Sequence, residues 1–94
     1  MNNLIISKAI QDKLLQRHKV TRREVEQCFE NRDGKLLTDT RAHTKTVPPT
    51  LWFVACTHGG RLLKVVYIQT EHNINLKSCF EPNEVEIAIY KRHG

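Results

Sequence analysis

Three cations in the last third of this 94-residue chain have the chemistry of a phosphate site: Arg61, Lys64 and Lys77. Arg61 and Lys64 belong to segment 60–69, whose mostly apolar side chains predict a strand buried on both faces. Burying an ammonium group without a partner is costly. Lys64 therefore needs a counter-ion, water or a ligand, and a phosphate is a ligand that several cations can hold together.

Strand pairing predicts what lies next to these cations. Gly59-Gly60 is typical of a two-residue hairpin turn. Such a turn puts Arg61 opposite His58. It also puts Lys64 opposite Ala55.

The second hairpin brings the two lysines together. A turn around residues 70–73 puts Lys64 near Cys79 and Lys77 near Val66, on one sheet face. The small side chains of Ala55 and Cys79 would leave room there for a phosphate. The alternative is that both lysines extend past the sheet edge into solvent. One sequence does not fix strand register, so both interpretations stay open.

Three further residues have the chemistry for proton transfer: Glu86, Tyr90 and His58. Glu86 and Tyr90 are four residues apart, so they share one face of a predicted helix. His58 lies at the predicted turn, within reach of the cations. Each also has a structural interpretation, as a helix-cap glutamate, a packing tyrosine and a surface histidine.

Other classes of chemistry have no support in the sequence. The histidines form no H-E-x-x-H pair and the chain has no Gly-rich phosphate loop, so we expect no metal and no cofactor. The three cysteines form no C-x-x-C pair, which favours reduced thiols and a cytoplasmic protein. No apolar run approaches the ~20 residues of a membrane span, and no signal peptide is recognised at the start.

Periodicity and caps predict a single α+β domain spanning residues 1–94. We expect two N-terminal helices, a three- to four-stranded antiparallel sheet and a C-terminal helix. Thr21 and Glu24 have capping-box spacing at the start of the second helix, and Asn83 and Glu86 have it at the last helix. The main predicted strands are 51–57, 61–69 and 74–80, with 4–6 and 35–40 as further candidates.

The chain resembles the BrnT-type toxins of bacterial toxin–antitoxin pairs, which belong to the RelE-like ribonuclease fold. The similar segments are Arg17-His18-Lys19-Val20, before a helix, and the strand Gly60–Tyr67. Laying the family's closing strand and helix on this chain matches Ser78, Glu86 and Tyr90. Small proteins of this type are also labelled ADP-ribosyl-(dinitrogen reductase) hydrolase, but this chain lacks the acidic metal cluster of the true hydrolases of that name.

The resemblance implies a metal-independent ribonuclease in which cations hold the scissile phosphate while the 2′-hydroxyl attacks. Its phosphate-binding residues would be Arg61, Lys64 and Lys77. Two arginines of the family's closing strand are replaced here by Asn75 and Phe80. That departure removes two cations from the expected catalytic set.

Three functional hypotheses follow. The first is a toxin-like RNA endonuclease, with RNA and a small antitoxin protein as partners. The second is a non-catalytic module of the same fold that binds nucleic acid or an acidic protein, which the net charge of +5 also favours. The third is a homodimer formed through an exposed strand edge.

Overall fold

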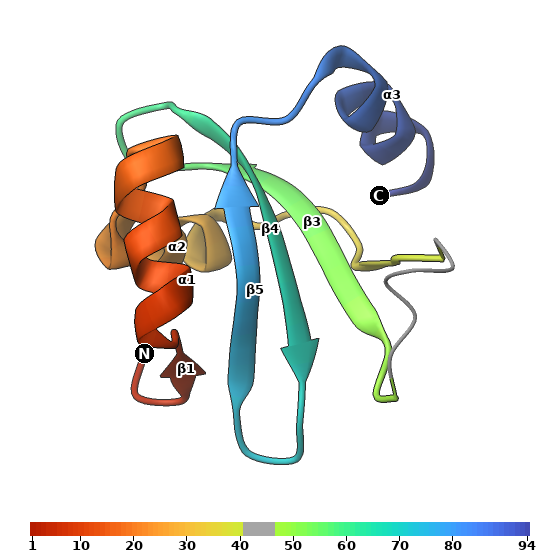
Figure 1. Ribbon diagram of the computed structural model, residues 1–94. Coiled ribbons are helices and arrows are strands. Elements are labelled where there is room, and N and C mark those ends of the chain that lie inside the picture. Colours follow the sequence, from red (N-terminus) through yellow and green to blue (C-terminus); the bar gives the residue numbers. More distant parts are fainter. Residues whose placement is uncertain (41–46) are drawn as a thin grey trace.

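The computed structural model describes residues 1–40 and 47–94, and these form one mixed sheet with helices on both of its faces (Figure 1). The sheet order is β1-β5-β4-β3-β2, with β1 parallel to β5 and the other neighbours antiparallel. The strands are β1 (Leu4–Ile5), β2 (Leu37–Thr38), β3 (Thr50–Cys56), β4 (Leu62–Gln69) and β5 (Ile74–Phe80). The α+β class is therefore confirmed. The expected antiparallel sheet of three or four strands is wrong, because the described part has five strands and a parallel edge.

Local sequence signals explain where the helices begin. The helical segments are α1 (Lys8–Lys13), its π-helical continuation η1 (Leu14–His18), α2 (Arg22–Asn31) and α3 (Glu84–His93). Thr21 and Glu24 form both hydrogen bonds of a capping box before α2. Asn83 and Glu86 do the same before α3. Both predicted caps are confirmed. None of the helices in the described residues is long and apolar enough to cross a bilayer.

The main core lies between one sheet face and the first three helical segments. In Figure 1, α1 lies beside β5 and α2 lies behind α1; the contacts of α2 with the sheet are to β3 and β4. Because strand side chains alternate between faces, Leu63 and Val65 point into this core while Lys64 and Val66 point to the opposite face. The buried core residues are Leu4, Leu14, Val20, Val25, Cys28, Phe53, Ala55, Leu63, Val65, Tyr67, Ile74, Leu76 and Cys79.

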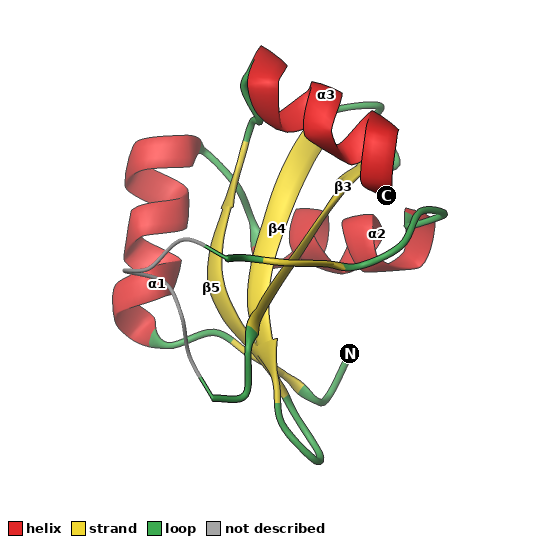
Figure 2. Cartoon of the chain, turned by 90° about the vertical axis from the view of Figure 1, so that its right-hand side faces the viewer, coloured by secondary structure: helices red, strands yellow, loops and turns green. Residues whose placement is uncertain are grey.

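The opposite sheet face is covered by α3, which lies across the ends of β3 and β4 and apart from α1 (Figure 2). A smaller apolar cluster of Trp52, Val54 and Val66 lies on this face, with Phe80 and Tyr90 packed against it. This face also carries Lys64. The position of α3 therefore decides what surrounds that lysine.

The β3–β4 register differs by one residue from the expected one. Leu62 pairs with Cys56 and Lys64 pairs with Val54, so the connection is a five-residue loop rather than a two-residue turn. Gly60 has a φ of 87°, in the left-handed region that glycine tolerates. A one-residue shift reverses the faces. Ala55 consequently lies in the main core, on the sheet face opposite to that of Lys64.

A β-bulge explains why β5 also departs from its expected pairing. Lys64 pairs with Phe80, and Val66 pairs with Ser78. The next residue pair skips Lys77, which is left without a partner across the ladder and is exposed. Cys79 pairs with Val65 and is fully buried in the main core. The expected phosphate space between two lysines and two small side chains therefore does not form.

Candidate functional site

Lys64 is explained by a partner on α3. Its Nζ lies 2.5 Å from Oε2 of Glu86, and the lysine is 6% exposed. The same Nζ lies 4.4 Å from the centroid of the Trp52 ring and 5.7 Å from that of Phe80. A charge-assisted hydrogen bond and two aromatic rings thus replace the water that the ammonium loses. This arrangement stabilises α3 on the sheet and leaves little of the lysine open to a phosphate.

Tyr90 also has a structural role, because it joins α3 to β3 and to the segment that precedes β2. Its hydroxyl donates a hydrogen bond of 2.9 Å to the carbonyl of Lys35, and the backbone amide of Val54 interacts with the same oxygen. Its ring lies 5.8 Å from that of Trp52. Burial raises the pKa of Tyr90. The phenol is therefore held as a neutral hydrogen-bonding group, and we name this arrangement the Tyr90 bridge.

Arg61 joins the β3–β4 loop to the junction between η1 and α2. Its guanidinium donates hydrogen bonds of 2.7 Å to the carbonyls of His18 and Lys19. It also pairs with Glu81 at 3.0 Å and with Glu24 at 3.4 Å. Two carboxylates and two carbonyls thus use the donors of this fork. Arg61 acts as a clamp in the fold.

The remaining two predicted site residues lie apart from this group. His58, in the same loop, places its Nε2 3.1 Å from Oε2 of Glu30 on α2, with both side chains about half exposed. Its backbone N–H donates to the side chain of Gln27. Lys77 is exposed at the bulge of β5. The predicted cations Arg61, Lys64 and Lys77 therefore belong to three different surroundings.

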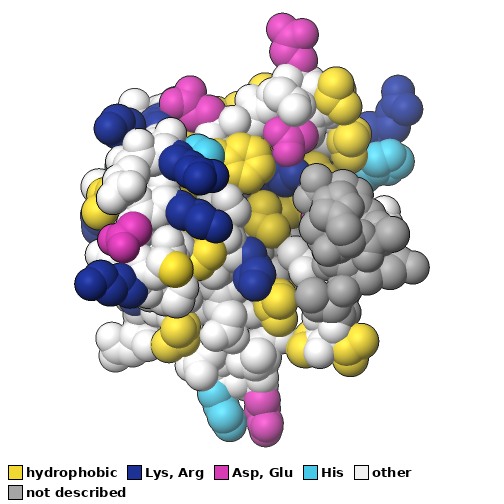
Figure 3. All heavy atoms as spheres, viewed as in Figure 1, with side chains coloured by type: hydrophobic (Ala, Val, Ile, Leu, Met, Phe, Trp, Pro, Cys, Tyr) yellow, Lys and Arg dark blue, Asp and Glu magenta, His cyan; other side chains and the backbone are white. Residues whose placement is uncertain are grey.

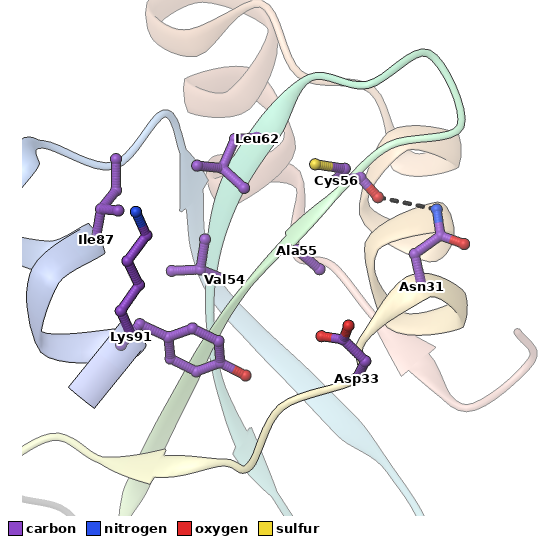
Figure 4. Close-up of a pocket in the computed structure, with 9 residues that line it drawn as sticks. Asn31, Asp33, Val54, Ala55, Cys56, Leu62, Ile87 and Lys91 are labelled. Atoms are coloured by element: carbon purple, nitrogen blue, oxygen red, sulfur yellow. Dashed lines mark hydrogen bonds between the residues drawn. The ribbon is translucent and has the colours of Figure 1, made fainter. Parts of the chain in front are cut away.

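A cleft of about 430 Å³ lies between the end of α2, strand β3 and α3 (Figure 4). Figure 4 shows Asn31 and Asp33 on one side, Lys91 on the other, and the apolar side chain of Val54 between them. The other lining residues are Ala55, Cys56, Leu62, Ile87 and Tyr90. Of the six residues expected from sequence to form the site, only Tyr90 lines it, so this cleft is not the predicted phosphate site.

A basic surface forms where the first helical segment meets β5. Figure 3 shows Lys and Arg side chains gathered over α1 and beside the sheet. We call this the α1–β5 surface; its exposed cations are Lys8, Lys13, Arg17, Lys19 and Lys77. Asp12 is the one acid between residues 1 and 19. Within residues 1–40 and 47–94, none of these five cations has a carboxylate within 4.0 Å.

Of these five cations, only Lys77 was predicted from sequence to bind phosphate; the other four were not selected. Lys13 and Arg17 are four residues apart, so they lie on one helical face, and that spacing was a usable signal. Nothing local indicated that β5 would lie beside that helix, because the contact joins segments far apart in the sequence.

An aromatic pair lies within the same surface. The rings of His18, at the end of η1, and Phe80, at the end of β5, have centroids 5.6 Å apart and an interplanar angle of 37°. Both residues are partly exposed. This pair was not expected from sequence, where Phe80 was assigned to the strand 74–80 and to the position of a family arginine.

The chain matches no protein-family model and no curated protein. In the described residues, no cluster of three or more His, Cys, Asp or Glu side chains could hold a metal ion.

Proposed function

We propose that this protein is a non-catalytic nucleic-acid-binding module that binds RNA through the α1–β5 surface. The observation that carries the proposal is the set of five exposed cations on adjoining elements without ion pairs among the described residues. Elsewhere, Arg23 and Arg61 are paired with carboxylates. Unpaired cations attract phosphates at little cost, because no existing ion pair has to break.

The buried position of Lys64 supports binding rather than catalysis. A metal-independent ribonuclease needs cations aimed at the charge that develops on the phosphate. Here Lys64 of β4 and Glu86 of α3 neutralise each other between the helix and the sheet, and Arg61 is held by Glu24 and Glu81. The RelE-like resemblance favours RNA as the nucleic acid, and a cytoplasmic location is part of the same proposal.

The second candidate is a BrnT-like endoribonuclease, with a small antitoxin as its partner. One observation favours it: the imidazole of His58 lies within hydrogen-bonding distance of the Glu30 carboxylate. A carboxylate in this position can orient a histidine that acts as a base. Both side chains are accessible. In this version, His58 would take the proton of the 2′-hydroxyl.

Binding is tested by fluorescence anisotropy with a labelled single-stranded RNA at increasing salt. If all five cations contact phosphates, the slope of log K against log salt is about −3.5, so affinity falls about 100-fold between 50 and 200 mM salt. Replacing one contacting cation should reduce that slope by about 0.7. Absence of binding at 50 mM salt would overturn the proposal.

Two helical arginines make a matched comparison. Arg17→Ala removes a cation of the α1–β5 surface, whereas Arg23→Ala removes an exposed arginine paired with Glu26 and Glu30 on α2. We expect the first variant to bind RNA more weakly and with a smaller salt slope, and the second to bind like the original protein. Equal losses in both variants would contradict the proposed surface.

The same RNA, incubated with the protein in a chelator and run on a gel, separates the two candidates. Intact RNA under conditions of full binding supports the module. Cleavage that disappears in His58→Ala would instead establish the endoribonuclease.

A further inference from the structure

The His18–Phe80 pair lies inside the α1–β5 surface. His18 is flanked in sequence by Arg17 and Lys19, and Phe80 is three residues beyond Lys77. Contacts between η1 and β5 bring these two chain segments together. Two partly exposed aromatic rings therefore lie on adjoining chain segments that also carry three exposed cations, none with an ion pair in the described residues.

The surrounding structure holds both rings in place. Arg61 donates hydrogen bonds of 2.7 Å to the backbone carbonyls of His18 and Lys19, which fixes the end of η1. Lys19 itself adopts a φ of 54°, which turns the chain sharply after the histidine. On the other side, Phe80 pairs with Lys64 in the sheet, and the Lys64 ammonium lies 5.7 Å from its ring. A base stacking on such a platform would order few additional groups.

A surface that combines aromatic rings with cations is suited to binding single-stranded nucleic acid. Proteins that bind single strands combine a basic track for the backbone with aromatic side chains on which bases stack. The bases of a duplex are already stacked and paired, so a duplex could offer this surface only its phosphates. Stacking on an aromatic side chain contributes about 1–3 kcal/mol per base.

We propose that the His18–Phe80 pair is a stacking site for one unpaired base, so that the ligand of the α1–β5 surface is single-stranded RNA. This inference rests on the proposed nucleic-acid-binding function and adds its substrate class. Phe80 supplies the larger apolar ring, and the tilted ring of His18, 5.6 Å away, supplies the second. The cations next to the pair hold the phosphates on either side of the stacked base.

The test uses a short oligouridine RNA with 2-aminopurine at its centre. Uridines stack weakly, so the probe is bright in the free strand and should be quenched when it stacks on Phe80. We expect Phe80→Leu, which keeps an apolar side chain, to remove the quenching. By the stacking energy above, it should weaken single-strand binding about 5- to 150-fold. Phe80→Tyr keeps a ring and should retain both effects.

A duplex of the same length is the second ligand. It should bind the original protein and Phe80→Leu equally, because it contacts only the cations. A probe that stays bright when the original protein is saturated overturns the stacking site, whether or not the leucine variant folds. In that outcome, salt-dependent binding would still support the proposed function. Absence of binding to either RNA would remove the proposed function itself.

Discussion

Replacing Glu86 with glutamine removes the negative charge beside the buried Lys64 while keeping the size of the side chain. The change is informative because Glu86 has two roles among the described residues: its Oε1 accepts the N–H of Asn83 in the helix cap, and its Oε2 pairs with Lys64. The amide oxygen of glutamine can still accept the cap hydrogen bond. The ammonium of Lys64, however, loses its counter-charge in a place where the side chain is only 8% exposed.

The size of the effect follows from these surroundings. Breaking a buried ion pair by removing one partner costs about 3–5 kcal/mol. The Trp52 ring, 4.4 Å from Nζ, remains and offsets about 1 kcal/mol of this. We therefore expect Glu86→Gln to lower the free energy of unfolding by about 2–4 kcal/mol. Lys64→Met removes the charge but keeps the length, and should cost about 1–2 kcal/mol.

The double variant isolates the pair. With neither charge present, no unpaired ion is left in the apolar cluster, so the loss should be about 2 kcal/mol less than the sum of the two single losses. Urea unfolding measures all four proteins. Trp52 is the one tryptophan of the chain and lies beside the pair, so its fluorescence reports on α3 directly. Circular dichroism reports on the whole fold in the same samples.

Glu84→Gln is the matched control for Glu86→Gln. Glu84→Gln removes an exposed carboxylate from the first turn of the same helix and should change the unfolding midpoint little. If the coupling between positions 64 and 86 is below about 0.5 kcal/mol, the pair does not hold α3 on the sheet. The structural explanation of Lys64 would then be wrong.

Three further predictions concern the Tyr90 bridge and the cysteines. Tyr90→Phe should lower the free energy of unfolding by about 1–2 kcal/mol, measured by urea titration, because the carbonyl of Lys35 loses its donor; no change would contradict the bridge. In the folded protein, a maleimide should label Cys56 alone, since Cys28 and Cys79 are fully buried, and mass spectrometry would reveal any second adduct. Burial raises the pKa of Cys28 to about 12 and that of Cys79 well above its usual range. The native state thus keeps protons that the unfolded chain releases above roughly pH 8.5, so stability should fall from there towards pH 12, and less steeply in Cys28→Ala; equal slopes would refute this.

The parts of the fold that sequence predicted depend on neighbours in the chain. The Thr21–Glu24 and Asn83–Glu86 caps each involve residues three apart, so their spacing alone is sufficient evidence. The β3–β4 register, by contrast, was not predicted correctly from neighbouring residues. Gly59-Gly60 favours a two-residue turn, but the Arg61 clamp to the end of η1 and the hydrogen bond from its own N–H to Oγ1 of Thr57 accompany a longer loop.

The candidate site was predicted less well because it depends on register and on contacts between distant segments. The bulge at Lys77 changes which residues of β5 share a face, and no local pattern marks it. Strict β-strand alternation over segment 74–80 would place Ser78 and Phe80 on one face with Leu76. Instead, Leu76 and Cys79 face the main core while Phe80 joins the opposite side.

The distribution of charged residues bears both on how the fold is held together and on where the proposed binding surface lies. Fifteen lysines and arginines face ten acids, so one-to-one pairing must leave at least some cations unmatched. Among the described residues, the acids that pair with lysine or arginine side chains lie on α2, on α3 and after β5. Three of these acids, Glu24, Glu81 and Glu86, pair with Arg61 or Lys64 and so join different parts of the fold. The first helical segment has almost no acid to offer, so its cations, with Lys77, make the α1–β5 surface.

The distribution of charge, rather than its total, therefore supports binding at one surface. A variant that moves charge without changing the total tests this directly. Arg17→Glu combined with Glu71→Arg keeps the net charge of +5 but shifts a cation to the exposed turn between β4 and β5. If overall charge attracts the RNA, affinity at low salt should be unchanged. If the α1–β5 surface binds it, the slope of log K against log salt should fall by at least about 0.7, because one phosphate contact is lost and a repulsive group replaces it.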